Sequence, residues 1–459
     1  MKAGISQFLD KYRDAVHDAL AQGLLTEADL DRAVRQNFRV MIKLGLLDPP
    51  ERVPYAKVDP ADEPWQRQAH KDLARLATQE SIVLLKNAPV RTGFARPRPF
   101  AGGAGPSQGP DRIDRMLPLD AAKLKTIAVI GPRAGEVLLD WYSGAPPYLV
   151  SPVEGVKRRL GLGEHDDKTG NARTVLFARD DQGGLAVKAA KAADVAVVVV
   201  GNHPSGDVGS WQMVALPSYG REAVDRQSIT LEDEELVRKV FAANRRTVVV
   251  LLASFPYAIS WTAEHVPAIV HATHSSQELG NALGDVLFGA YDPGGRLVTT
   301  WPRSLGDLPP MMDYDIRHGR TYQYFKGKPL YPFGYGLSYT TFAYSSLGTS
   351  AESLPKDGAV TVSVDVKNTG SREGDEVVQL YVRRPGSRVA RPRQELKGFR
   401  RVHLAAGAGA RVDLPLRAAD LGTWDQGRKT FTVEPGPLEL RVGSSSADIR
   451  LTKTIAIAN

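Results

Sequence analysis

The residue best placed to do chemistry is Glu278, in the stretch PAIVHATHSSQELGNALGDVLFG that runs from Pro267 to Gly289. A short apolar run comes first, then a polar turn that carries Glu278, and then apolar residues at the spacing of an amphipathic helix. The carboxylate is therefore expected at the carboxyl end of a buried strand. In open α/β sheets ligands bind in the crevice outside those strand ends, so a general acid or base would be useful there.

A structural interpretation of Glu278 is also open. The tetrapeptide from Ser275 to Glu278 matches S-x-x-E, the capping box, in which the Glu side chain reaches back to an amide at the start of its own helix. The start of a helix also favours an ionised carboxylate, whereas a catalytic acid must carry a proton. Spacing alone does not decide between a catalytic and a capping role.

Five segments of the chain resemble successive motifs of glycoside hydrolase family 3, which contains β-glucosidases and β-xylosidases. They are SIVLLKN (81–87), IAVIGP (127–132), GREAVDRQSITL (220–231), SQELGNALGDVLFG (276–289) and LYPFGYGLSYTTFAY (330–344). The resemblance implies that Glu278 is the catalytic acid/base, because it matches the family's Q-E-x-G-N-A-L motif. In members without that Glu, the resemblance implies that a Glu just before a D-R pair takes this role, and Glu222 matches that position.

The first 48 residues are similar to the end of the family's amino-terminal (β/α)8 barrel. Apolar spacing predicts two amphipathic helices within residues 6–45, the second of which is capped by Thr26 and ends near Lys43. In the family the nucleophile is an Asp that precedes this point, usually in S-D-W. The resemblance therefore implies that the barrel and its Asp are missing from these 459 residues.

Asp140, Trp141 and Tyr142 form a second group of interest. They follow the strand-like run 127–131 and precede the turn-rich residues 143–147. We expect a loop that faces a sugar, with the aromatic rings as a platform that has a polar handle. An ordinary aromatic loop packed on a neighbour is the alternative. The D-W pair looks like the nucleophile motif, but its place in the second domain of the pattern does not fit that role.

The residues that carry these side chains have an α/β pattern. Apolar, β-branched runs at 126–130, 195–200, 247–252 and 268–272 are typical of strands buried on both faces. Helical segments lie between them, which predicts a parallel, doubly wound sheet whose loops open on one edge. Those loops contain Asp140 to Tyr142, His203 and Asp207, Phe255 to Tyr257, and Glu278. His203, His271 and His274 have no carboxylate at a metal-ligand spacing, so no metal or other cofactor is expected.

After the sheet the pattern changes to a period of two. Alternating runs such as 360–366 and 411–416 predict a β-sandwich, and the region resembles the family's fibronectin type III-like domain. The expected domains are the barrel helices (1–48), a linker (49–70), the α/β sandwich domain (71–304), a connector (305–345) and the β-sandwich (346–459). Residues 91–110, rich in Pro and Gly, are expected to be a flexible loop. The basic run 383–393 is interpreted as a solvated loop.

Composition excludes several classes of protein. Fifty-nine Lys and Arg give a formal net charge of +7, but they are interleaved with 52 acidic residues, so no nucleic-acid partner is expected. There is no cysteine, which excludes disulfides and thiolate metal sites. Neither a signal peptide nor a membrane span is expected in these residues. The localisation stays open, and full-length members of the family are often periplasmic or secreted.

The expectation that follows is a glycoside hydrolase that removes terminal β-D-glucosyl or β-xylosyl groups by a retaining mechanism. Its nucleophile would lie outside this chain, which alone would be inactive or weak. The alternative is a non-catalytic carbohydrate-binding or accessory subunit that pairs with a separate barrel chain. The partners expected are a β-linked saccharide and either a second copy in a homodimer or that barrel chain.

Overall fold

The structure is a computed structural model that describes residues 1–7, 11–59, 61–90, 115–140, 142–163, 173–205, 226 and 228–458. It divides into two compact units, Met1–His70 and Lys71–Asn459. Because the two units are separate bodies, each is described by itself. The domain boundaries proposed from the sequence stay a prediction.

The first unit contains α1 (Arg13–Ala21) and α2 (Glu27–Lys43). The Thr26 hydroxyl accepts a hydrogen bond from the Asp29 amide, and the Asp29 carboxylate accepts one from the Thr26 amide, so the predicted cap is confirmed. Three short 3-10 helices follow, η1 (Pro50–Arg52), η2 (Pro54–Lys57) and η3 (Pro64–Gln66).

A six-stranded sheet forms the centre of the second unit, in the order β1-β6-β5-β4-β2-β3. The strands are β1 (Val83–Asn87), β2 (Thr126–Ile130), β3 (Thr174–Ala178), β4 (Val195–Gly201), β5 (Thr247–Leu252) and β6 (Ala268–Ala272). The four strands predicted from the sequence coincide with β2, β4, β5 and β6. The prediction of a wholly parallel sheet was wrong at one edge, because β1 pairs antiparallel to β6.

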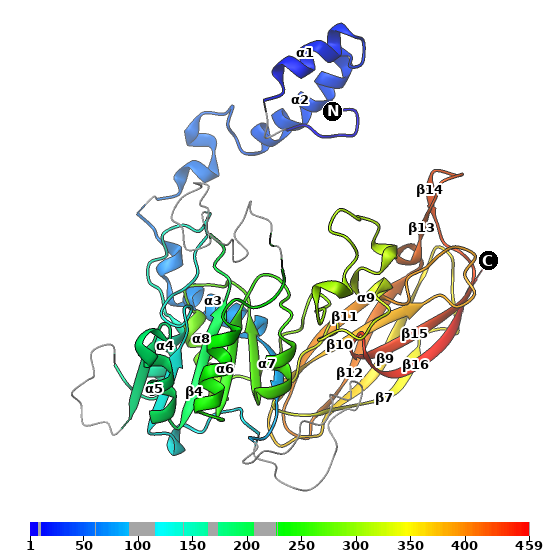
Figure 1. Cartoon of the computed structure of the whole chain (residues 1–459). Helices are drawn as coiled ribbons and strands as arrows, with labels where there is room; N and C mark the ends of the chain where they lie inside the picture. The colour runs from blue at the N-terminus through cyan, green and yellow to red at the C-terminus, as the bar shows by residue number, and fades with distance from the viewer. Residues whose placement is uncertain are drawn as a thin grey trace. The chain divides into compact units, whose positions relative to one another are not determined.

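Helices cover both faces of this sheet, which confirms the doubly wound fold. One face packs against α4 (Pro152–Arg159) and α8 (Leu279–Leu287), and α3 (Gln68–Ser81) lies beside α8. The other packs against α5 (Leu185–Ala192), α6 (Glu234–Ala243) and α7 (Ser260–His265), and these three helices lie in front of the sheet in Figure 1. Both faces of the central strands are buried, as the continuous apolar runs require.

The β-sandwich at the carboxyl end, drawn in yellow to red in Figure 1, has a five-stranded sheet, β11-β10-β15-β16-β8, and a three-stranded sheet, β12-β9-β7. Its strands are β7 (Phe342–Thr349), β8 (Ser353–Leu354), β9 (Ala359–Asn368), β10 (Gly374–Arg383), β11 (Glu395–Leu404), β12 (Gly409–Arg417), β15 (Gly436–Ser445) and β16 (Asp448–Ile457), with a separate hairpin of β13 (Thr423–Asp425) and β14 (Thr430–Thr432). Alternate side chains of both sheets meet in one core, so the predicted sandwich is confirmed.

Buried polar contacts join the sandwich to the α/β domain. Arg296 lies just after the last helix of the α/β domain, and its guanidinium is 3.2 Å from the carboxylate of Glu376 on β10. The Gln379 amide donates to the carbonyl of Gly334 in the connector. That connector contains η6 (Leu305–Asp307), η7 (Ile316–His318) and α9 (Thr321–Tyr324). The two domains and their connector therefore form one body.

The basic run 383–393 was interpreted from the sequence as a solvated loop, but part of this run is buried. The side chains of Arg384 and Arg391 are buried, and Arg384 donates to the Glu434 carbonyl. The Glu434 carboxylate accepts hydrogen bonds from the Ser387 hydroxyl and the Arg388 amide, and the Ser387 contact in particular lowers its pKa. Part of the run is thus held against the domain by hydrogen bonds to Glu434, which is distant in sequence.

In the part of the chain that the structure describes, no helix is both long and apolar enough to cross a membrane.

Candidate active site

Glu278 lies between β6 and α8, immediately before the first residue of that helix. Its side chain is buried, with 6% of the residue exposed. One carboxylate oxygen accepts a hydrogen bond from the Tyr148 hydroxyl at 2.5 Å, and the other accepts one from the Asn281 amide at 2.6 Å. The capping interpretation is wrong, because the Glu278 side chain makes no capping hydrogen bond. Both carboxylate oxygens face side-chain donors instead.

The position of Tyr148 depends on how the segment before α4 crosses the start of α8. The Val150 amide donates to the Gln277 carbonyl at 2.9 Å, and the Val150 carbonyl accepts from the Gly280 amide at 2.8 Å. These two backbone hydrogen bonds flank Glu278. Since Tyr148 is only two residues before Val150, they hold its ring beside the carboxylate.

Glycines allow α4 and α8 to come this close. A Cβ atom built on Gly155 would lie 1.8 Å from the Gly280 carbonyl oxygen, and one built on Gly280 would lie 2.0 Å from the Ser151 carbonyl oxygen. No larger residue fits at either position without moving a helix. The two glycines therefore help to fix the distance between Tyr148 and Glu278.

The Tyr148 phenol stays protonated over the ordinary pH range. Burial is the main reason that its pKa rises to about 12, and the hydrogen bond to Glu278 adds to the effect. The Lys71 ammonium group lies 5.1 Å from the centre of the ring. A tyrosine hydroxyl can donate to a carboxylate or accept from a carboxylic acid. This hydrogen bond can therefore persist whether or not Glu278 carries a proton.

Polar residues from neighbouring strands also lie at this edge of the sheet. The ring Nε2 of His274, which follows β6, donates to the carbonyl of Asn202, which follows β4, at 2.9 Å. Burial lowers the pKa of His274, and the positive charge of Arg133, which follows β2, contributes to the same shift. Arg133 itself is buried and donates to the Gly201 carbonyl. The structure thus brings together the carboxyl ends of three strands.

The loop with Asp140 and Tyr142 belongs to the same edge. The Asp140 carboxylate accepts hydrogen bonds from the Ser143 hydroxyl and from the amides of Tyr142 and Ser143. The Ser143 hydroxyl is the main cause of its lowered pKa, and its negative charge acts on His274. The Tyr142 residue is 73% exposed. Asp140 therefore stabilises a turn that presents an aromatic ring to the solvent.

Tyr257, which the sequence assigned to this edge, lies elsewhere. Tyr257 is fully buried in the core, where Arg226 covers both its ring and that of Phe255, so the expectation that it faces a ligand was wrong. The Tyr257 ring gains more apolar contact inside the domain than at its edge. His271, which was not assigned to the edge, lies within β6, where its ring contacts Trp301 and burial lowers its pKa to about 4.

Glu222, Trp141 and Asp207, together with the insertion 91–110, lie outside the described residues. Within the described residues, no three His, Cys, Asp or Glu side chains lie close enough together to hold a metal ion.

Sequence reasoning missed Tyr148 and Asn281, which both contact Glu278. Asn281 could have been found, because residues three apart on a helix face the same side. Tyr148 could not, because 130 residues separate it from Glu278 and only the crossing of α4 and α8 brings the two together.

Comparison with known proteins places this arrangement in context. A β-xylosidase from Formosa agariphila is 32% identical over 431 residues, which cover 91% of this chain and 54% of the relative. A periplasmic β-glucosidase from Salmonella typhimurium is 31% identical over 490 residues, which cover 98% of this chain and 59% of the relative. A solved β-glucosidase structure from Erythrobacter marinus has a TM-score of 0.75 at 28% identity, and covers 96% of this chain and 57% of that one. The chain spans just over half the length of these relatives.

Two family domains account for most of the second unit. Residues 376–446 match the fibronectin type III-like domain. Residues 82–339 match the glycosyl hydrolase family 3 C-terminal domain, over more than half of the chain. That second match contains the six-stranded sheet and the buried carboxylate with both of its hydrogen-bond donors. The sheet, the β-sandwich and the sequence motifs agree: the chain belongs to glycoside hydrolase family 3.

Proposed function

We propose that this chain is the part of a family 3 retaining β-glycosidase that carries the acid/base residue, and that the enzyme acts on terminal β-D-glucosides or β-xylosides. The observation that carries the proposal is the Glu278 carboxylate, which lies at the carboxyl edge of the sheet and is held by Tyr148 and Asn281. The relatives named β-glucosidase and β-xylosidase support the substrate class.

In the proposed mechanism Glu278 acts twice. It first protonates the glycosidic oxygen as the leaving group departs, and then takes a proton from the water that attacks the covalent intermediate. The nucleophile would be an Asp from the barrel found in full-length members, with the two carboxyl groups about 5 to 5.5 Å apart. Tyr148 and Asn281 would hold Glu278 in a fixed position through both steps. Asp140, Trp141 and Tyr142 would contact the sugar.

The amino-terminal helices support the idea that a barrel completes the enzyme. Val34, Phe38 and Ile42 recur every four residues along α2, and 46% to 59% of each is exposed. Such a row forms one apolar face of a helix. The last helices of a (β/α)8 barrel have such a face, which packs on the strands of the barrel. A barrel supplied as a separate chain would cover the same face, so the accessory-subunit alternative predicts the same exposed residues.

The experiment is to assay hydrolysis of aryl β-D-glucosides and β-D-xylosides by these 459 residues, alone and with a family 3 barrel fused before residue 1. We expect weak or undetectable hydrolysis by the chain alone, because loss of a nucleophile costs several orders of magnitude in rate. The fusion should be active. Turnover by the chain alone at about 1 per second or above would contradict the proposal and make Asp140 the first residue to test. An inactive fusion that binds the glycosides would favour the accessory subunit.

A further inference from the structure

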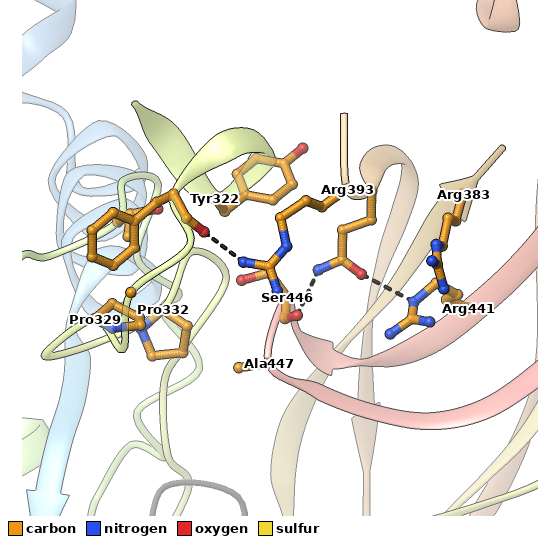
Figure 2. Close-up of a pocket in the computed structure, with 12 residues that line it drawn as sticks. Tyr322, Pro329, Pro332, Arg383, Arg393, Arg441, Ser446 and Ala447 are labelled. Atoms are coloured by element: carbon orange, nitrogen blue, oxygen red, sulfur yellow. Dashed lines mark hydrogen bonds between the residues drawn. The ribbon is translucent and has the colours of Figure 1, made fainter. Parts of the chain in front are cut away.

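A cavity remote in sequence from Glu278 lies where the connector meets the β-sandwich. Its volume is about 420 Å³, which is within the usual range for small-molecule sites. Figure 2 shows the residues that line it. Pro329 and Pro332 lie on the left, Arg383 and Arg441 on the right, and Arg393 and Ser446 between them. None of these residues contacts Glu278 or the edge of the six-stranded sheet.

Three arginines line this cavity, and they are poorly neutralised. Arg383 on β10 and Arg441 on β15 share one carboxylate, that of Glu439, at 3.6 Å and 2.6 Å respectively. Arg393 donates to the Phe325 carbonyl at 2.6 Å and pairs with no carboxylate among the described residues. The nearest acid along the chain, Glu395, pairs with Lys397. The cavity therefore has an excess of about two positive charges, which an anion would offset.

Hydrogen bonds hold one wall of the cavity rigid. The Gln394 amide donates to the Ser446 carbonyl at 2.6 Å, and the Gln394 side-chain oxygen accepts from the Arg441 Nε at 3.1 Å; both bonds are drawn in Figure 2. The Arg441 guanidinium is thus oriented before any ligand arrives. A fixed, planar guanidinium is suited to bidentate binding of a carboxylate.

The aromatic and proline residues that line the rest of the cavity indicate what kind of molecule the anionic group belongs to. Tyr322 stacks on Phe333 at 4.3 Å between ring centres, and with Phe325, Pro329 and Pro332 it gives the cavity a flat apolar side. Thr300 also lines the cavity, and its buried hydroxyl has no hydrogen-bond partner among the described residues. A sugar ring has an apolar face of C–H groups and a rim of hydroxyls, which matches both features.

We propose that this cavity binds a carboxylate-bearing saccharide, such as a uronic acid unit of a polysaccharide chain, at a site separate from the catalytic one. The arginines would bind the carboxylate, the aromatic and proline wall would pack on the ring, and Thr300 would bond to a ring hydroxyl. The saccharide part of this inference rests on the proposed function, whereas the anion-binding part rests on the cavity alone. Such a site would hold an acidic polymer while the enzyme acts on its neutral units.

The test is isothermal titration calorimetry of the 459-residue chain with methyl β-D-glucuronide and, as the neutral match, methyl β-D-glucoside. We expect the glucuronide to bind at least about tenfold more tightly, because a hydrogen bond to a charged group contributes about a factor of ten or more in affinity. Arg383→Gln should weaken glucuronide binding by about tenfold. The Arg383 side chain is 54% exposed and has only a 3.6 Å ion pair, so the variant should fold normally.

A matched control is Arg417→Gln, which removes an exposed arginine of the same β-sandwich that is paired with Asp420. It should leave glucuronide binding unchanged. Equal weakening in both variants, equal binding of the two glycosides, or no binding at millimolar concentration would each overturn the inference.

Inorganic phosphate distinguishes a saccharide site from a site for small anions. If phosphate binds as tightly as the glucuronide and displaces it, the saccharide part is wrong. This binding requires no nucleophile. If the barrel fusion does not hydrolyse glycosides, that result contradicts only the proposed function. If the chain does not bind the glucuronide, that result contradicts only this inference.

Discussion

The two ends of α8 each carry a buried carboxylate, and their surroundings differ. Glu278, just before the helix, has two neutral donors, Tyr148 and Asn281. Asp285 lies near the other end and is only 1% exposed. Its carboxylate accepts a hydrogen bond from the Gln79 amide and pairs with the guanidinium groups of Arg75 and Arg159. Opposite charges neutralise Asp285 permanently, which suits a structural link between helices. Glu278 makes no ion pair among the described residues, and this is the arrangement that the proposed acid/base role needs.

The comparison shows that burial alone does not distinguish a carboxylate held by ion pairs from one held by neutral hydrogen-bond donors. A buried carboxylate with charged partners stays ionised and stabilises the fold, whereas one with hydroxyl and amide partners can change its protonation state without breaking an ion pair. Both carboxylates lie in the family motif, seven residues apart, one just before α8 and one within it. Only their partners distinguish them.

The largest effect is expected from removing Glu278 in the barrel fusion. Glu278→Ala should lower kcat/KM for substrates with poor leaving groups by about 100- to 10,000-fold, the usual contribution of general acid–base catalysis. Activated aryl glycosides should be affected far less, since their leaving groups need little protonation, and azide should restore turnover. The measurement is kcat/KM across a series of aryl glycosides with different leaving groups. If Glu222→Ala gives this pattern and Glu278→Ala does not, Glu222 is the acid/base.

The next largest effect is expected on the stability of the fold at low pH, and it comes from a third buried group, His271. Its ring has no charged hydrogen-bond partner among the described residues. Burial lowers its pKa to about 4 from an ordinary value of 6.5, while Nδ1 donates to the Leu251 carbonyl. Between pH 6.5 and pH 4, His271 is therefore protonated in the unfolded chain but neutral in the folded chain. The free energy of unfolding decreases as the pH falls through this range. The loss from this group is at most about 3 kcal/mol.

Urea unfolding at pH 7 and pH 4.5 measures this loss. His271→Asn keeps a side-chain donor but cannot titrate, so it should flatten the pH dependence. His17→Asn, at an exposed residue in the first unit, is the matched control and should leave the dependence unchanged. An unaltered pH dependence in His271→Asn would mean that other groups cause the acid destabilisation.

A smaller effect is expected at the structural end of α8. Asp285→Asn should destabilise the second unit by about 2 kcal/mol, less than the full cost of breaking a buried pair, because the side chains of Arg75 and Arg159 remain 38% and 32% exposed. Glycosidase activity in the folded fraction of the barrel fusion should stay the same. The measurement is urea unfolding, with Asp420→Asn as the control at an exposed ion pair. A large loss of kcat without loss of stability would break the distinction between the two carboxylates.

The smallest effect is expected from Tyr148→Phe, which removes one of the two donors to Glu278. Substrates with poor leaving groups should lose about tenfold in kcat, with little change in KM, since a hydrogen bond to a charged group contributes on the order of 1.5 kcal/mol or more. Tyr314→Phe, at a tyrosine that is 82% exposed in the connector, should have no effect. The measurement is kcat and KM of both variants of the barrel fusion for substrates with good and poor leaving groups. An equal loss for all leaving groups would show that Tyr148 does not act through Glu278.

The sequence by itself determined the elements of this protein. Continuous β-branched runs identified the four central strands, because a strand covered by helices on both faces needs apolar side chains throughout. Alternation identified β9 and β12, because alternate side chains of each strand face the core and the others are more exposed. The family motif identified Glu278. The edge strands β1 and β3 were missed, since a short run at an edge carries no periodicity of its own.

Only the tertiary structure decided which partners each carboxylate has. The hydrogen bond from Tyr148 and the ion pairs of Asp285 join residues that lie 126 to 210 positions apart along the chain. No local pattern specifies such contacts. Those between the α4 region and α8 depend on Gly155 and Gly280, which let the two helices cross with their backbones in contact. The same reason explains the basic run, in which Arg384 and Arg391 are buried while Arg383 and Arg393 line a cavity. Spacing in the sequence sets which face of an element a side chain is on, and packing between distant elements sets what that side chain meets.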